Sequence, residues 1–69
     1  MVKVGDIIKC GGVTVTVAKI AYVEHFPATA FSPAWLSVEF WDTTGNYRSW
    51  KPVYDGGEIV RNGETVFSW

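Results

Sequence analysis

VEFWDTTGNYRSWK, residues 38–51, is the stretch of the sequence that decides the fold. Its centre, Asp42-Thr43-Thr44-Gly45, is polar and lies between two runs rich in aromatic residues. Asp at the first position and Gly at the fourth favour a type I turn. The β-branched and aromatic residues on either side favour strands. The stretch therefore predicts a β-hairpin.

The turn also sets the expected register of this hairpin. A bulge after Gly45 pairs Asp42 with Asn46, Trp41 with Tyr47, Phe40 with Arg48 and Val38 with Trp50. Because side chains alternate between the two faces of a strand, this register separates the aromatic residues. Leu36, Val38, Phe40 and Trp50 are expected on the core face. The opposite face is expected to carry Trp41, Tyr47, Glu39, Ser49 and Lys51.

Turn signals recur at short intervals along the rest of the chain and predict an all-β fold. We expect one domain, residues 1–69, forming a small β-barrel of five or six short antiparallel strands in meander order. One hairpin turns at Gly11-Gly12, with an apolar face made of Val4, Ile8, Cys10, Val13, Val15 and Val17. After Val17 the apolar positions change phase, which indicates a bulge or bend. The last hairpin turns at Asn62-Gly63, a type I′ signal, and is expected to set Ile59 against Val66.

A long connection is expected at about residues 24–34, EHFPATAFSPA. Pro27 and Pro33 lack the backbone donor that a strand interior needs. Phe26 and Phe31, with three alanines, predict that the loop folds down onto an apolar surface. Long loops in compact domains are often functional.

Composition limits the classes of function. Six basic and seven acidic residues are scattered singly, so no strong positive field is present to attract duplex nucleic acid. The single cysteine excludes an intramolecular disulfide and fits a reducing compartment. Residues 1–10 lack the features of a signal peptide, and no apolar run approaches the roughly 20 residues that span a bilayer. We expect a soluble, cytoplasmic protein.

The opening VGDII (residues 4–8), the long second connection and the turns that follow resemble those of SH3-like small β-barrels. The ALYDY-type signature of peptide-binding SH3 domains is missing, so the resemblance does not imply their proline-peptide site. WDTTGNYRSWK and YDGGEI are similar to stretches in short uncharacterised proteins of bacterial phages and mobile elements. That similarity implies a small accessory or inhibitory protein.

The chain offers little for catalysis or metal binding. Cys10 and His25 are the only thiol and imidazole, and a cysteine on an apolar face is usually an inert small hydrophobe. A structural zinc site needs about four ligands, and the glycine pairs lack the phosphate-loop context. We expect no enzyme activity, no metal and no cofactor.

The candidate binding residues are Trp41, Tyr47, Arg48, Lys51, Phe26 and Phe31. Trp41 and Tyr47 either form a stabilising cross-strand pair, which the long loop could cover as a second small core, or stand exposed as a binding patch. Trp, Tyr and Arg are enriched at interface hot spots. We therefore expect a non-catalytic protein–protein interaction module, possibly self-associating. The alternative is single-stranded nucleic-acid binding, with bases stacked on Trp41 and Tyr47 and phosphates on Arg48, Lys51 or Lys9. Glu39 and Asp42 offset that positive charge and favour a protein partner.

Overall fold

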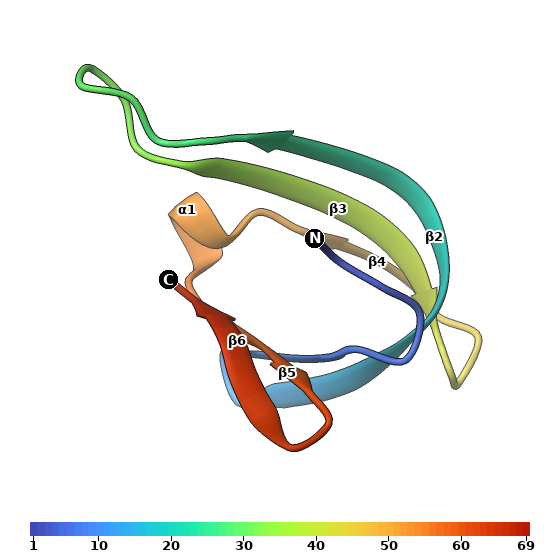
Figure 1. Cartoon of the computed structure of the whole chain (residues 1–69). Coiled ribbons are helices and arrows are strands. Elements are labelled where there is room, and N and C mark those ends of the chain that lie inside the picture. The colour runs from blue at the N-terminus through green and yellow to red at the C-terminus, as the bar shows by residue number, and fades with distance from the viewer.

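A computed structural model describes all 69 residues. The six strands and one helical turn, in chain order, are β1 (Ile7–Cys10), β2 (Val13–Phe26), β3 (Trp35–Asp42), β4 (Tyr47–Trp50), α1 (Pro52–Asp55), β5 (Glu58–Arg61) and β6 (Glu64–Ser68). All pairings between neighbouring strands are antiparallel. Figure 1 shows these elements along the chain. The predicted all-β fold is confirmed.

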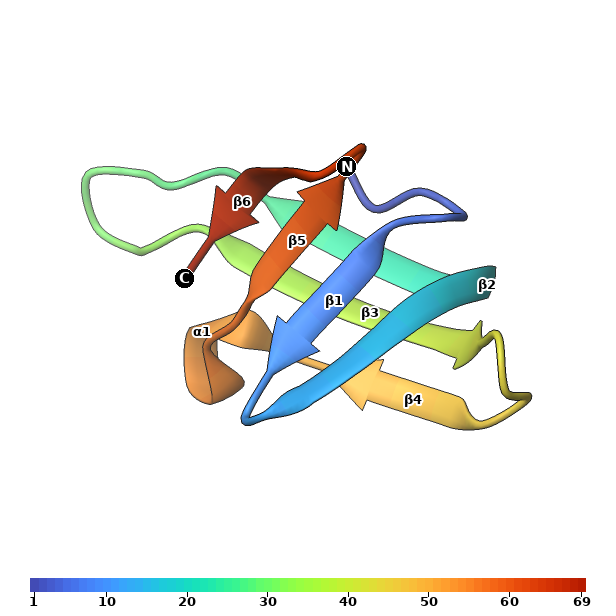
Figure 2. The ribbon, with the colours of Figure 1, turned by 90° about the horizontal axis from the view of Figure 1, so that it is seen from below.

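The strands form a single sheet in the order β4-β3-β2-β1-β5-β6. The predicted meander holds from β1 to β4 and again from β5 to β6. Between them, α1 carries the chain across the molecule, so that β5 pairs with β1 rather than with β4. The sheet bends over itself, and β1, β5 and β6 lie across from β3 and β4 (Figure 2). The result is a small, barrel-like globule.

The bend lies in β2, the strand shared by both halves of the sheet. Its register against β3 shifts between Val17 and Lys19 and again between Ile20 and Tyr22, leaving Ala18 and Ala21 unpaired. Bulges of this kind bend a strand and increase its twist. The phase change after Val17 thus marks the position where the sheet turns back on itself, as the sequence predicts.

The core lies between the two halves of the sheet. Its buried apolar residues are Val2, Ile8, Val17, Leu36, Val38, Phe40, Trp50 and Ile59. The predicted pairing of β3 with β4 is confirmed residue by residue, and Asp42 and Asn46 are joined by a backbone hydrogen bond of 2.9 Å. Val4 and Val13 are exposed, contrary to prediction, because they lie before β1 and beside the tip of the first hairpin, beyond the reach of the opposite half.

The last hairpin differs from its predicted register by one residue. Asn62 and Gly63 both have positive φ, as a type I′ turn requires, and Arg61 pairs with Glu64. A bulge then leaves Val66 unpaired and sets Phe67, not Val66, against Ile59. Phe67 consequently packs on the core. The turn residues alone could not predict this bulge.

A charged pair joins the start of the chain to β5. The guanidinium of Arg61 donates to both carboxylate oxygens of Asp6 at 2.8 Å, and the backbone N–H of Lys3 donates to the same carboxylate at 2.8 Å. Asp6 is only 1% exposed. The hydrogen bond from Arg61 holds the pKa of Asp6 below its usual value. In the sequence, both residues are isolated charges, so the pair could not be predicted.

Candidate functional site

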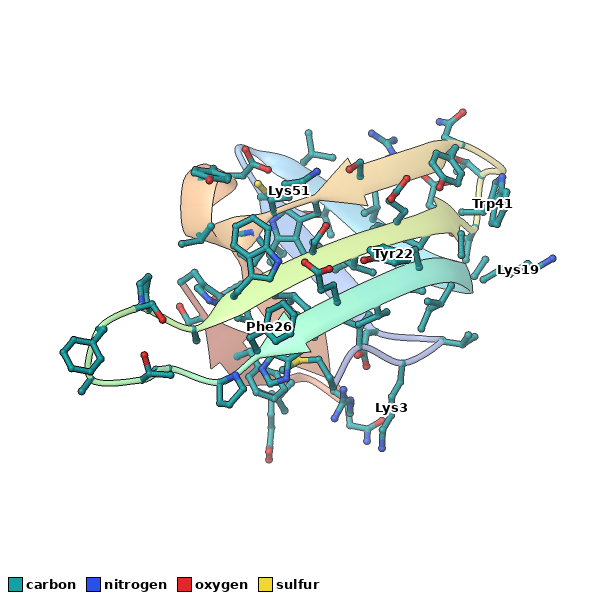
Figure 3. The ribbon with its side chains drawn as sticks, turned by 90° about the horizontal axis from the view of Figure 1, so that it is seen from above. Lys3, Lys19, Tyr22, Phe26, Trp41 and Lys51 are labelled. Atoms are coloured by element: carbon teal, nitrogen blue, oxygen red, sulfur yellow. The ribbon has the colours of Figure 1, made fainter.

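One side of the β2–β3–β4 sheet faces away from the core, and we call it the outer face. Figure 3 views the molecule from this side, and no other element lies over the strands. Strand pairing places side chains in rows across this face. From the β3–β4 turn toward the long loop, the rows are Lys19, Trp41 and Tyr47; Tyr22, Glu39 and Ser49; Glu24 and Ser37; Phe26 and Trp35.

Trp41 and Tyr47 form the aromatic pair at one end of the outer face. Their ring centroids are 4.9 Å apart and their planes meet at 74°, an edge-to-face contact. Trp41 is 36% exposed and Tyr47 is 50% exposed. The Nζ of Lys19 lies 5.4 Å from the centroid of the Trp41 ring, within cation–π range. Both rings lie on the face that the hairpin register predicts.

Asp42 fixes the turn that carries this pair. Its carboxylate accepts hydrogen bonds from the Thr44 backbone N–H at 2.9 Å, the Thr44 hydroxyl at 2.6 Å and the Asn46 N–H at 3.1 Å. Arg48 Nε donates to the other carboxylate oxygen at 2.9 Å. These bonds, led by that of the Thr44 hydroxyl, hold the pKa of Asp42 well below its usual range. The aromatic pair is therefore held on a well-ordered turn.

The structure separates Arg48 from the other predicted site residues. Arg48 pairs with Phe40 and so lies on the opposite side of β4 from Trp41 and Tyr47. Its guanidinium forms the ion pair with Asp42. Lys51 follows β4, and its Nζ lies 3.5 Å from the hydroxyl of Ser49 on the outer face. In Figure 3, Lys19 lies near the Trp41 end of this face, and Lys51 lies at its β4 edge.

The long loop is shorter and more exposed than predicted. β2 continues through Phe26, with Glu24 paired to Ser37, so the connection runs from residue 27 to residue 34. It projects from the body of the molecule (Figure 1), and Phe31 is fully exposed. The prediction that it folds onto an apolar surface is wrong, because the loop is held by its own bonds: Thr29 Oγ1 accepts from the N–H groups of Phe31 and Ser32. It does not cover Trp41 and Tyr47, which lie at the other end of β3.

Phe26 and Phe31, both predicted site residues, thus differ in their setting. Phe26 is 56% exposed and belongs to the outer face, where it pairs with Trp35. Phe31 lies on the projecting loop, apart from that face.

Several residues of the outer face were not predicted from the sequence. Trp35 Nε1 donates to Glu24 Oε1 at 2.7 Å, and the hydroxyl of Tyr22 donates to Glu24 Oε2 at 2.8 Å. Tyr54, on α1, lies edge to face with Trp35, with the ring centroids 5.7 Å apart. The two bulges in β2 obscured the alternation that assigns Tyr22 and Glu24 to this face.

Glu39, the second carboxylate on this face, also accepts a hydrogen bond from an aromatic side chain. The hydroxyl of Tyr47 donates to Glu39 Oε1 at 2.8 Å. The hydrogen bonds to Glu24 and Glu39 raise the pKa values of Tyr22 and Tyr47 respectively. The outer face thus contains aromatic rings, two glutamates and two lysines, and its formal charges balance.

Other titratable groups lie apart from this face. Cys10 pairs with Val13 at the first residue of β2, whereas His25 pairs with Leu36 near the other end of the same strand. Cys10 is half-buried rather than fully buried, and its sulfur lies 3.6 Å from the carbonyl oxygen of Asp55. No group of three or more His, Cys, Asp or Glu residues is placed to hold a metal ion. The structure has no helix with the length and apolar character needed to cross a bilayer.

Comparisons of the chain with protein-family models, with curated protein sequences and with solved structures gave no match. The structure itself defines the class: a small, all-β, barrel-like domain with one aromatic sheet face left open.

Proposed function

We propose that this chain is a non-catalytic protein–protein interaction module that binds its partner through the outer face. One observation carries the proposal: Trp41 and Tyr47 stay 36% and 50% exposed on an ordered hairpin. Rigid aromatic side chains lose little conformational entropy when a partner covers them. Tryptophan and tyrosine also supply much of the binding energy at interfaces.

The exposed rings also have a structural role, but it does not account for the whole face. An edge-to-face pair can stabilise a sheet by about 0.5–1.5 kcal/mol beyond its area burial. Tyr22 and Phe26 add further exposed aromatic surface on the neighbouring strand. Exposed apolar surface gathered on one face of a small protein is typical of interaction sites, and this favours a binding role.

We also propose that the chain is a small accessory or inhibitory protein of the cytoplasm and that its fold is an SH3-like barrel. The pairing of β1 with both β2 and β5, and the single helical turn before β5, support the SH3-like assignment. The similarity of residues 41–51 and 54–59 to short phage and mobile-element proteins favours the accessory role.

Single-stranded nucleic-acid binding is the second candidate, favoured by the position of Lys19 beside the Trp41 ring. Bases stack on such rings, but binding also needs a basic groove along the phosphates. Glu24 and Glu39 lie on the same face and would repel phosphates. Charge therefore favours a protein partner.

Site-specific photo-cross-linking in the native host tests the proposal. A photoreactive phenylalanine analogue replaces Ser49, which is exposed on the outer face, or Thr65, which is exposed on β6. We expect a discrete protein adduct from position 49 that is absent from position 65. Equal labelling from both positions, or none from position 49, would contradict the proposal. Salt-dependent binding of a short single-stranded oligonucleotide, lost on Trp41→Ser, would favour the second candidate.

A further inference from the structure

Glu24 and Glu39 are half-buried carboxylates without a cationic partner in the chain. The chain forms two ion pairs, Arg48 with Asp42 and Arg61 with Asp6, and neither involves these glutamates. Their hydrogen-bond donors are neutral side chains. Neutral donors orient a carboxylate but leave its negative charge in place.

The carboxylates keep spare capacity to accept hydrogen bonds. Each carboxylate oxygen can accept about two. Glu39 Oε1 accepts one, from Tyr47, while Oε2 accepts none from the protein. Each oxygen of Glu24 accepts one. An external donor can therefore bind at Glu39 without displacing the tyrosine.

The lysines of the outer face do not neutralise these charges. The Nζ of Lys19 lies against the Trp41 ring, and that of Lys51 lies near the hydroxyl of Ser49. Neither comes within ion-pair distance of a glutamate. Lys19 belongs to the Trp41 row at one end of the face, and Lys51 follows β4 at the edge of the face, whereas Glu39 lies in the row next to Trp41.

Aromatic residues surround Glu39 on three sides. Tyr22 is its cross-strand neighbour on β2, Trp41 follows two residues along β3, and Tyr47 bonds to it from β4. A guanidinium fits such surroundings best, because it is planar, donates two parallel hydrogen bonds to a carboxylate and stacks on aromatic rings. A lysine ammonium offers charge and cation–π attraction, but it lacks the planar pair of parallel donors.

We propose that the partner presents an arginine side chain to Glu39, with its guanidinium flanked by Tyr22, Trp41 and Tyr47. Glu24, in the next row, adds a second negative charge to the site. This inference rests on the proposed function and specifies the chemistry of the partner segment. It predicts a partner segment in which the arginine is flanked by apolar residues that cover the remaining rings.

Nuclear magnetic resonance titration with three short peptides tests the proposal. The probes are Ac-Gly-Arg-Gly-NH2, its lysine analogue and its citrulline analogue, which has the shape of arginine without the charge. We expect saturable shifts of the backbone amides of Tyr22, Glu39 and Tyr47, strongest for arginine, weaker for lysine and smallest for citrulline. Equal shifts from the citrulline peptide, or shifts confined to other parts of the protein, would overturn the proposal.

Matched variants identify the carboxylate to which the arginine peptide binds. Glu39→Gln keeps an acceptor for Tyr47 but removes the negative charge, and should weaken arginine binding about fivefold, as expected for a partly exposed ion pair. Glu64→Gln, on β6, removes an exposed carboxylate and should leave binding unchanged. An unchanged midpoint of the arginine-peptide titration in Glu39→Gln would contradict the proposal.

The two proposals fail separately. If photo-cross-linking from position 49 succeeds and the arginine peptide does not bind, the interaction module stands and the arginine inference is rejected. If the arginine peptide binds at Glu39 and no protein adduct forms, the chemistry of the site stands and the interaction module is rejected.

Discussion

Trp41 and Tyr47 meet edge to face across the β3–β4 hairpin, with their ring centroids 4.9 Å apart, on the side opposite to the core. Asp42 determines that outcome, because its carboxylate binds the turn and so fixes the register. A shift of one residue in that register would exchange the two faces of the strand. The turn thus decides both which aromatic residues are buried, Phe40 and Trp50, and which two are displayed.

Trp50 is a buried aromatic residue of the core. It is buried, its indole N–H donates to the carbonyl of Gly56 at 2.9 Å, and it packs edge to face with Trp69. Trp50→Ala should lower the free energy of unfolding by about 3–5 kcal/mol. The matched control, Phe31→Ala, removes a fully exposed ring and should leave the denaturation midpoint unchanged. Similar midpoints for the two variants would contradict this assignment.

Gly57 marks a close approach between the start of β5 and β1. A Cβ at this position would lie 2.6 Å from the carbonyl oxygen of Lys9, and φ is +112°. Gly12 also has positive φ, but a Cβ there would contact nothing within 4 Å. Chemical denaturation should therefore show that Gly57→Ala destabilises the domain more than Gly12→Ala, by roughly 1–3 kcal/mol of added overpacking. Equal losses of stability in the two variants would mean that strain from the positive φ, and not the contact with Lys9, determines the cost of the substitution.

Acid should destabilise the domain through Asp6 and Asp42. Hydrogen bonds from Arg61, and from Thr44 and Arg48, hold the folded-state pKa values of these carboxyls below their unfolded values near 3.9. Their contribution to stability is present above that pH and is lost as the pH falls through the lower folded values. Melting temperature should thus fall steeply below about pH 4.

A substitution separates Asp6 from the other carboxyls in that acid response. Asp6→Asn leaves Arg61 without its charged partner and should lower the free energy of unfolding by about 3 kcal/mol at pH 7. In this variant the melting temperature should also fall less steeply below about pH 4, which is the acid limb of the plot of melting temperature against pH. Glu64→Gln, at an exposed position on β6, should leave the acid limb as it is. An unchanged limb in Asp6→Asn would show that this carboxyl does not cause the acid sensitivity.

The sequence was sufficient to predict the all-β fold, the β3–β4 register and the sidedness of Trp41, Tyr47 and Trp50. It could do so because Asp42-Thr43-Thr44-Gly45 and Asn62-Gly63 carry their turn chemistry locally. The phase change after Val17 also predicts a bulge or bend in β2, and Ala18 is unpaired there. No local signal predicts the bulges that leave Ala21 and Val66 unpaired, and these bulges change which residues of β2 and β6 face the core.

The errors at the candidate site have two causes. Arg48 was grouped with Trp41 and Tyr47 by composition, although alternation along β4 places it on the other side, with Asp42. Glu24 and Trp35 are eleven residues apart in the chain and meet only because β2 pairs with β3. Residues brought together by pairing across the long loop could not be predicted from spacing.

The central claim is that Trp41 serves binding rather than the core, and one variant tests it most directly. Photo-cross-linking from position 49 is repeated with Trp41→Ser, after thermal melts establish that the variant is folded. We predict a loss of stability of about 1 kcal/mol, from the missing cross-strand pair, and at least a tenfold drop in adduct yield, as for a hot-spot residue. A folded variant with undiminished adduct, or a variant that unfolds, would contradict the claim; unfolding would assign Trp41 to the core together with Trp50.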